Sequence, residues 1–174
     1  MINDGDTLLL DGGTTTYEVA RLLVGRHLQI VTNSLPVANL FASATNTDLV
    51  LVGGYVYPRT GVSLGPYANQ VLASLNVRRT VLSVAGINDR GFYNSNLLLV
   101  ETERAMLEAS EEVIVVADSS KFGHQSLARL CPLERIDYLV VDHEIDGLWR
   151  DKLEAAGVQL VVAEPIAEQT VTKS

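Results

Sequence analysis

Apolar, β-branched runs recur along this chain, and five of them stop at a short stretch rich in Gly, Thr, Ser, Asn or Asp. The five runs are Thr7–Leu10, Leu28–Val31, Asp48–Val52, Thr80–Val84 and Glu112–Ala117. Amphipathic segments separate them, and the last run shows little period-two alternation, which is typical of strands covered on both faces. The pattern predicts an α/β fold in which helices cover a mostly parallel sheet.

The segments between the runs carry helical signals, such as apolar residues at helical spacing and a proline in a first turn. We predict helices over Thr16–Val24, Leu35–Ala44, Pro66–Leu75, Glu101–Ser110 and Gly147–Ala156. Further strands are predicted over Tyr138–Val141 and Val158–Ala163, followed by a polar tail over Pro165–Ser174. We therefore expect one domain over residues 1–164 and a C-terminal tail over residues 165–174.

The composition fits a globular domain with a sizeable core, because 47% of the 174 residues are hydrophobic. The single cysteine, Cys131, cannot form an internal disulfide, the start Met1–Asp6 lacks the features of a signal peptide, and no apolar run approaches membrane-spanning length. These features predict a cytoplasmic protein with no membrane partner. The formal charge of −8 works against binding a nucleic-acid backbone, so we expect the chain alone not to bind DNA.

The small polar stretches predict a ligand site. In an open parallel sheet, ligands bind in the crevice beyond the carboxyl ends of the strands. We therefore expect the five loops to converge on one pocket. They are Asp11–Thr16, Thr32–Ser34, Gly53–Gly54, Ala85–Asn88 and Asp118–Lys121.

The loop Asp11–Thr16 is the strongest local signal. Gly12 and Gly13 allow a tight turn with exposed N–H groups, and the threonine hydroxyls and the start of a helix add donors and positive potential. These features favour an anion, most simply a phosphate. The alternative is that Thr and Gly merely cap a helix. The loop has neither the lysine of a Walker motif nor GxGxxG spacing, which disfavours a nucleotide.

The other loops allow two interpretations each. Thr32–Ser34 can cap a helix, which is the more common role, or bind sugar hydroxyls. Arg59, which follows Gly53–Gly54, can clamp a phosphate or remain a solvated surface side chain. Asp118 and Lys121 can form an ion pair that fixes a turn, unless a ligand separates them.

Two glutamates are candidate catalytic residues, and the histidines and the cysteine are the residue types to consider for a metal site. Glu101 and Glu103 open a predicted helix, where negative charge complements the dipole, and they are also the nearest candidates for a general base. The three histidines and the cysteine show no metal-ligand spacing, so we predict no metal site and no cofactor. No Ser-His-Asp set can be argued from spacing.

The ordered set of loop motifs resembles the C-terminal sensor domain of DeoR-type transcriptional repressors, over most of the chain from about Ile2 to Ala163. The motifs are Asp11-Gly12-Gly13-Thr14-Thr15, Val31-Thr32-Asn33-Ser34, Val52-Gly53-Gly54, Gly86-Ile87 and Asp118-Ser119-Ser120-Lys121-Phe122-Gly123. The resemblance implies a Rossmann-like sheet with helices on both faces, related to ribose-5-phosphate isomerases and coenzyme A transferases. It also implies a homo-oligomer that binds a phosphorylated sugar or sugar derivative.

The family's regulators carry an N-terminal winged helix-turn-helix domain, which is absent from this chain, so we expect a fragment that reaches operator DNA only through that domain. The resemblance implies that residues of these loops contact the ligand. The chemistry of the side chains adds Thr16, Arg59 and Asp118 to the expected contacts. The expected ligand-binding residues are Asp11, Gly12, Gly13, Thr14, Thr15, Thr16, Thr32, Asn33, Ser34, Gly53, Gly54, Arg59, Gly86, Asp118 and Lys121.

The leading functional hypothesis is a ligand-sensing module for carbohydrate metabolism that is not an enzyme. The alternative is a sugar-phosphate isomerase in which Glu101, Glu103 or Asp118 acts as the base and Lys121 stabilises an enediolate. A third interpretation, an oligomerisation module without a ligand, is weakened by the polar loops. A shared fold does not confer shared chemistry, which favours the sensor.

Overall fold

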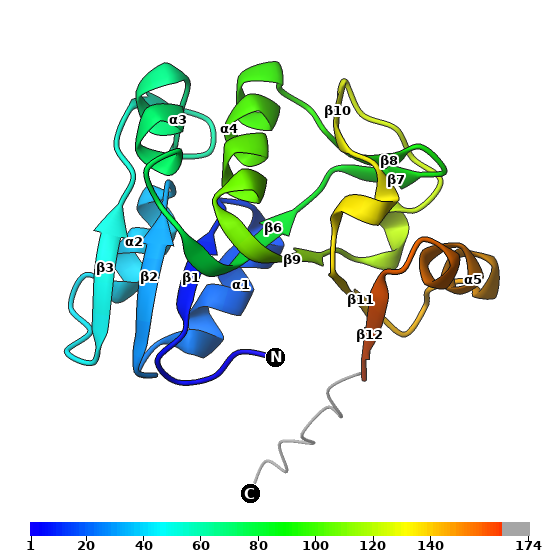
Figure 1. Ribbon diagram of the computed structural model, residues 1–174, viewed down its shortest axis with the longest axis horizontal. Coiled ribbons are helices and arrows are strands. Elements are labelled where there is room, and N and C mark those ends of the chain that lie inside the picture. The colour runs from blue at the N-terminus through cyan, green and yellow to red at the C-terminus, as the bar shows by residue number, and fades with distance from the viewer. Residues whose placement is uncertain (165–174) are drawn as a thin grey trace, which may run out of the picture.

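Seven parallel strands form the central sheet of the protein, whose computed structural model describes residues 1–164 (Figure 1). Across the sheet the strands follow the order β12-β11-β9-β6-β1-β2-β3. They are β1 (Thr7–Leu10), β2 (Leu28–Thr32), β3 (Thr47–Leu51), β6 (Val77–Ser83), β9 (Ser110–Val116), β11 (Tyr138–Asp142) and β12 (Gln159–Ala163). The predicted tail, residues 165–174, lies outside the described residues. No helix within residues 1–164 is long and apolar enough to cross a membrane.

Helices cover both faces of this sheet. They are α1 (Thr14–Leu23), α2 (Leu35–Phe41), α3 (Pro66–Leu72), α4 (Leu97–Glu108) and α5 (Gly147–Ala155). Strand β1 is buried on both sides: Leu8 and Leu10 pack in the cluster formed with α1 and α2, whereas Leu9 packs in the cluster formed with α3, α4 and α5. The predicted α/β fold, with a parallel sheet between two helical layers, is confirmed.

Two smaller sheets are additional to the prediction. Strands β4 (Tyr55–Tyr57) and β5 (Val62–Leu64) form an antiparallel hairpin, and β7 (Gly86–Asn88), β8 (Gly91–Asn94) and β10 (Ala128–Cys131) form a three-stranded antiparallel sheet. Each of these strands has only three or four residues, so it shows too little periodicity to distinguish it from a loop. The hairpin places its turn, residues 58–61, above the carboxyl ends of the sheet.

Helix α4 begins four residues earlier than predicted. The side chain of Asn96 accepts hydrogen bonds from the backbone N–H groups of Leu98 and Leu99 and so caps the helix at that point. Glu101 and Glu103 therefore lie inside the helix, and the interpretation that they complement its dipole at the first turn is wrong. The predicted starts of α2, α3 and α5 agree with the structure.

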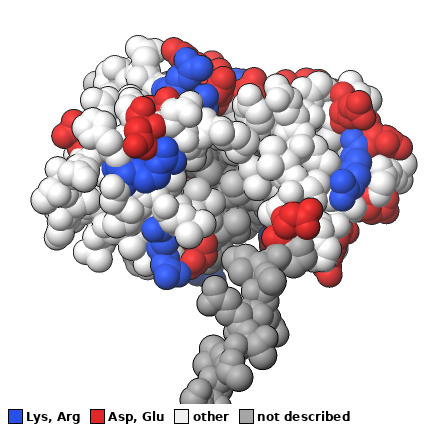
Figure 2. All heavy atoms as spheres, turned by 90° about the horizontal axis from the view of Figure 1, so that it is seen from below, with Lys and Arg blue, Asp and Glu red and all other residues white. Residues whose placement is uncertain are grey.

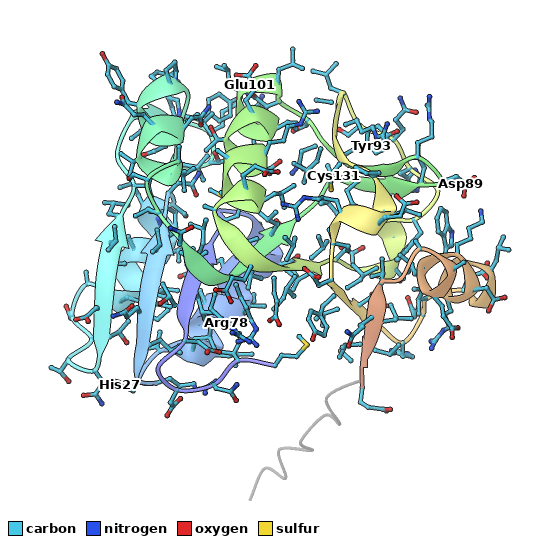
Figure 3. All side chains as sticks on the ribbon, in the orientation of Figure 1. His27, Arg78, Asp89, Tyr93, Glu101 and Cys131 are labelled. Carbon is cyan, nitrogen blue, oxygen red and sulfur yellow. The ribbon has the colours of Figure 1, made fainter. Side chains whose placement is uncertain are left out.

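The amino ends of the strands carry balanced charge. His27 and Arg78 lie there, at the lower edge of the sheet in Figure 3. Arg79 is almost fully buried and pairs with Asp6 and with Glu112. Figure 2, which views the molecule from this side, shows basic side chains interspersed with acidic ones. This face therefore presents no extended basic surface among the described residues.

Candidate functional site

The strand order places a crevice at the carboxyl ends of β1 and β6. From β1 the chain moves to β2 and β3 in one direction, and β6, β9, β11 and β12 follow in the other. The order therefore reverses between β1 and β6, and such switch points are where open α/β sheets bind ligands. Three adjoining cavities lie at this point, and Thr60 lines all of them.

We call the smallest of these cavities, of about 90 Å³, the inner chamber. It is lined by Asp11, Gly12, Gly13, Thr60, Val62, Ser83, Asn94, Leu99 and Glu103. The other two are the outer recesses. One, of about 450 Å³, lies against α1 and includes Thr14, Ser34 and Arg59, and the other, of about 460 Å³, lies against the start of α4 and includes Arg59 and Asn96.

The first outer recess is built on the amino end of α1. Helix α1 starts at Thr14 after the N-cap residue Gly13, and no side chain forms a hydrogen bond to cap it. The backbone N–H groups of a helix's first turn have no partner within the helix and carry the positive end of its dipole. Because Gly12, Gly13 and Thr14 line the recess, this uncapped end can bind an anion there.

Gly12 and Gly13 serve close packing rather than a left-handed turn, because neither lies among the described glycines with positive φ. A Cβ atom at Gly12 would lie 2.0 Å from Cγ1 of Val62, and one at Gly13 would lie 1.6 Å from Oγ of Ser83. The reason for glycine here is therefore the space that a side chain would need. The glycines allow the β1–α1 loop to contact β5 and the end of β6.

A pair of buried acids forms the floor of the inner chamber. Asp11 is 3% exposed and Glu103 is 0% exposed. The side-chain amide Nδ2 of Asn94 donates to Oε1 of Glu103 (2.6 Å) and to the carbonyl of Ser83 (3.2 Å). Oδ1 of Asp11 and Oε2 of Glu103 have no hydrogen-bond partner among the described residues.

This environment perturbs both acids. Burial raises the pKa of Asp11 to about 6, although hydrogen bonds with the backbone of Gly12 and Ser83 oppose the shift. Burial is also the main cause that raises the pKa of Glu103 well above its ordinary value, and the neighbouring charge of Asp11 adds to it. Both shifts favour the protonated form of the acids, and because the two carboxyls interact, they titrate as a unit.

The loop after β2 is mainly structural. The hydroxyl of Thr32 donates to the carbonyl of Leu10 (2.7 Å), and Asn33 donates through Nδ2 to the carbonyl of Ser63 (3.0 Å). Ser34 caps α2 and also lines the first outer recess. Two further expected residues, Thr15 and Thr16, belong to α1, where Thr16 is fully buried.

The remaining expected residues do not line the crevice. Gly53 and Gly54 follow the edge strand β3, and Gly86 begins β7. Asp118 caps a short 3₁₀ helix after β9, where its Oδ2 lies 3.5 Å from Nζ of Lys121. Loops after β1, β2 and β6 therefore contribute to the crevice, whereas the residues directly after β3 and β9 are not among those that line its cavities. Ligand contact at Lys121 stays a prediction.

Asn94, Thr60 and Ser83 were missed as site residues, and Glu103 was named only as a possible base. A sequence signal for Glu103 exists: it follows Val100 by three residues and precedes Leu107 by four, so it occupies a core position of an apolar helix face. A carboxylate at such a position is rarely fully buried unless it has a partner, which for Glu103 is Asn94. Within residues 1–164, no group of three or more His, Cys, Asp or Glu side chains could hold a metal ion.

Comparisons with known proteins show which family the chain is similar to. The model of the DeoR C-terminal sensor domain matches residues 1–143. A protein of Escherichia coli O157:H7, described as a candidate transcriptional repressor of the aga operon, is 34% identical over 93% of this chain and 61% of its own length. The transcriptional repressor AccR of Agrobacterium fabrum is 39% identical over 82% of this chain and 56% of its own length. The chain thus spans about three fifths of these relatives.

One solved structure shares the fold over most of this chain. The β subunit of eIF2B from Chaetomium thermophilum has a TM-score of 0.51 at 13% identity, over 79% of this chain and 44% of that chain. For ribose 5 phosphate isomerase A from Neisseria gonorrhoeae the TM-score is 0.49 at 16% identity, over 70% of this chain and 47% of that chain. The family model covers most of the chain and agrees with the resemblance of its loop motifs, so this protein belongs to the family of DeoR C-terminal sensor domains.

Proposed function

We propose that this chain is the effector-binding domain of a cytoplasmic DeoR-type transcriptional regulator in carbohydrate metabolism. The effector is a phosphorylated sugar or sugar derivative, and it controls DNA binding by an N-terminal winged helix-turn-helix domain outside this chain. The repressor names of the similar proteins support the regulatory role. A homo-oligomer belongs to the proposal, because a two-fold operator needs two recognition helices at a fixed spacing.

The observation that carries the proposal is the uncapped amino end of α1 beside Arg59. Arg59 lines both outer recesses and forms no hydrogen bond or ion pair with any described residue. A phosphate in the recess against α1 would accept hydrogen bonds from backbone N–H groups and pair with this guanidinium. Both groups are in place to bind an anion without breaking an existing ion pair.

Ligand binding here can connect separate parts of the fold. The crevice is bordered by the β1–α1 loop, by Thr60 in the β4–β5 hairpin and by Leu99 in α4. A ligand that contacts all three favours the arrangement in which they are closest. It can shift the domain only by the difference in its affinity for the two arrangements. The shift between the two arrangements is the change that would be transmitted to a DNA-binding domain.

The isomerase alternative is less well supported. Glu103 has the raised pKa of a possible base, but enediolate stabilisation needs a cation or donor set beside the reacting carbon. No Lys, Arg or His lies among the residues that line the inner chamber, and Lys121 pairs with Asp118 elsewhere. Incubation with aldose phosphates separates the two functions, because an isomerase converts them and a sensor only binds them.

Calorimetry of wild-type protein and the Arg59→Gln variant tests the phosphate subsite. We expect Arg59→Gln to weaken binding of a sugar phosphate by roughly tenfold to a hundredfold, because it removes a charge-assisted hydrogen bond. The free energy of unfolding should not change. Arg78→Gln is the matched control, since Arg78 is exposed at the amino ends of the strands, away from the recess, and pairs with Glu111. Equal affinities for all three proteins would contradict the assignment of Arg59.

A further inference from the structure

The inner chamber and the outer recesses differ in the sign of their charge. The first outer recess has the positive end of α1 and Arg59, and its one acid, Glu18, is paired with Arg21. The ionisable residues that line the inner chamber are both acids, Asp11 and Glu103. One ligand that occupies both spaces therefore meets an anion-binding end and an acidic end. Its two ends must differ in chemistry to match.

The acids have acceptor capacity that the protein does not use. Oδ1 of Asp11 and Oε2 of Glu103 are buried without a partner among the described residues, and both side chains line the chamber. Buried polar atoms of this kind cost free energy unless a hydrogen bond satisfies them. The chamber, at about 90 Å³, has room for roughly three water-sized groups. The two oxygens therefore favour a small group that donates hydrogen bonds.

The chamber is unsuited to a second anion. Asn94 uses both hydrogens of its amide, one on Glu103 and one on the carbonyl of Ser83, so this amide has no donor left for a ligand. An anionic group would also lie beside Asp11 and Glu103 in a place where burial strengthens repulsion. A phosphate or a carboxylate at this end of the ligand is therefore disfavoured.

We propose that the inner chamber binds the neutral, hydroxyl-bearing end of a sugar monophosphate and excludes an anionic end, and that Glu103 determines this specificity by direct contact. The inference rests on the proposed function, since it takes the phosphate at the outer recess as given. A hydroxyl suits the acid pair because it donates to a carboxylate and accepts from a protonated carboxyl. The raised pKa values of both acids favour the protonated form, which supplies such a donor.

The proposal predicts a pattern of ligand preference. Monophosphates of neutral sugars place hydroxyls in the chamber and gain affinity over inorganic phosphate. Sugar bisphosphates and phosphorylated sugar acids place a charge in the chamber and bind no more tightly than inorganic phosphate. A site that hydrogen-bonds a ligand's polar groups discriminates strongly against ligands that leave its own buried groups unpaired.

The test is calorimetry at pH 7.5 with wild-type protein, Glu103→Gln and Glu101→Gln. Glutamine keeps the shape of Glu103 and an Oε1 that can accept from Asn94, but it removes the ionisable acid. Glu101 is the matched control, because it is exposed near the upper end of the same helix (Figure 3). The probes are inorganic phosphate, glucose 6-phosphate, fructose 6-phosphate, ribose 5-phosphate, glucosamine 6-phosphate, fructose 1,6-bisphosphate and 6-phosphogluconate.

We expect inorganic phosphate to bind all three proteins equally. At least one neutral monophosphate should bind wild-type protein and Glu101→Gln on the order of tenfold or more tighter than inorganic phosphate, and Glu103→Gln should lose at least tenfold of that affinity. The bisphosphate and 6-phosphogluconate should bind no tighter than inorganic phosphate. Denaturant melts check that Glu103→Gln is folded, and Asp11→Asn, with the same expected loss, is the second variant.

Three results would overturn the inference while the proposed function stands. They are monophosphate binding that is equal in wild-type protein, Glu103→Gln and Asp11→Asn; tighter binding of the bisphosphate or of 6-phosphogluconate than of every neutral monophosphate; and binding of glucosamine 6-phosphate alone, which would indicate a cation site. If sugar monophosphates bind no tighter than inorganic phosphate, or if no probe binds at all, the proposed function fails as well.

Discussion

Gly12→Ala is expected to destabilise the protein by roughly 1–3 kcal/mol, the usual cost of overpacking, and to weaken effector binding in the same variant. The new Cβ would lie 2.0 Å from Cγ1 of Val62 and 3.1 Å from Cβ of Ser34, so the β1–α1 loop must move away from β5. That movement displaces the amino end of α1, on which the phosphate subsite is built. Denaturant melts and calorimetry with inorganic phosphate measure the two effects.

A second substitution identifies the cause of this effect. Val62→Ala removes the atom that the new methyl group would meet, so the double variant Gly12→Ala, Val62→Ala should recover part of the stability that Gly12→Ala loses. Gly147→Ala is the control, because a Cβ there meets no atom within 4 Å and φ is not positive. Additive losses in the double variant would show that contact with Val62 is not the reason for Gly12.

The second large effect is on the pH dependence of stability. The folded protein holds the pKa of Asp11 at about 6, above the value of 3.8 for a free aspartate. An acid whose pKa is higher in the folded than in the unfolded protein contributes its full stabilisation below the unfolded pKa. That contribution is lost as the pH rises through the folded pKa. The titration of Asp11 alone should therefore lower the free energy of unfolding by on the order of 3 kcal/mol between about pH 4 and pH 7. The pKa of Glu103 shifts in the same direction, so its titration adds to the loss of stability with rising pH.

The measurement is the difference in the free energy of unfolding between wild-type protein and Glu103→Gln, taken from pH 4.5 to pH 8. The difference cancels the contributions of titrating groups that do not interact with Glu103, and it retains the coupling between Glu103 and Asp11. We expect the stability of the variant to increase relative to that of wild-type protein as the pH rises, because the variant lacks one of the two buried acids. Glu101→Gln should give a difference that is flat with pH. A flat difference for Glu103→Gln would mean that its carboxylate is solvated, in contradiction to the buried pair.

Much of the fold could be predicted from the sequence because the large sheet leaves a simple pattern. Strand β1 matches its predicted range, Thr7–Leu10, and the starts of α2, α3 and α5 were also correct. These elements combine buried apolar runs with local stop signals. The antiparallel strands β4, β5, β7, β8 and β10 could not be predicted, since each depends on partners that the chain supplies far away or across a short turn.

The site was predicted in part for the same reason. Loops next to β1 and β2 carry local signals, and Gly13 and Ser34 indeed lie at the crevice. Which loops meet depends on strand order, and the order was not predicted. Lys121 follows β9, on the far side of β6 from β1, and it is not among the residues that line the cavities. Glu103 enters from a helix rather than from a strand end, and the misplaced start of α4 concealed its core position.

The backbone amide NMR spectrum, titrated with inorganic phosphate and then with glucose 6-phosphate, tests the central claim most directly. The amides of Gly13, Thr14 and Thr15 belong to the proposed anion site at the start of α1. We expect saturable shifts that are largest at these residues for both ligands, with further shifts at Asn94 for the sugar phosphate alone. Saturable shifts confined to other regions, such as the loop around Lys121, or no saturable shift at Gly13–Thr15 would contradict the account.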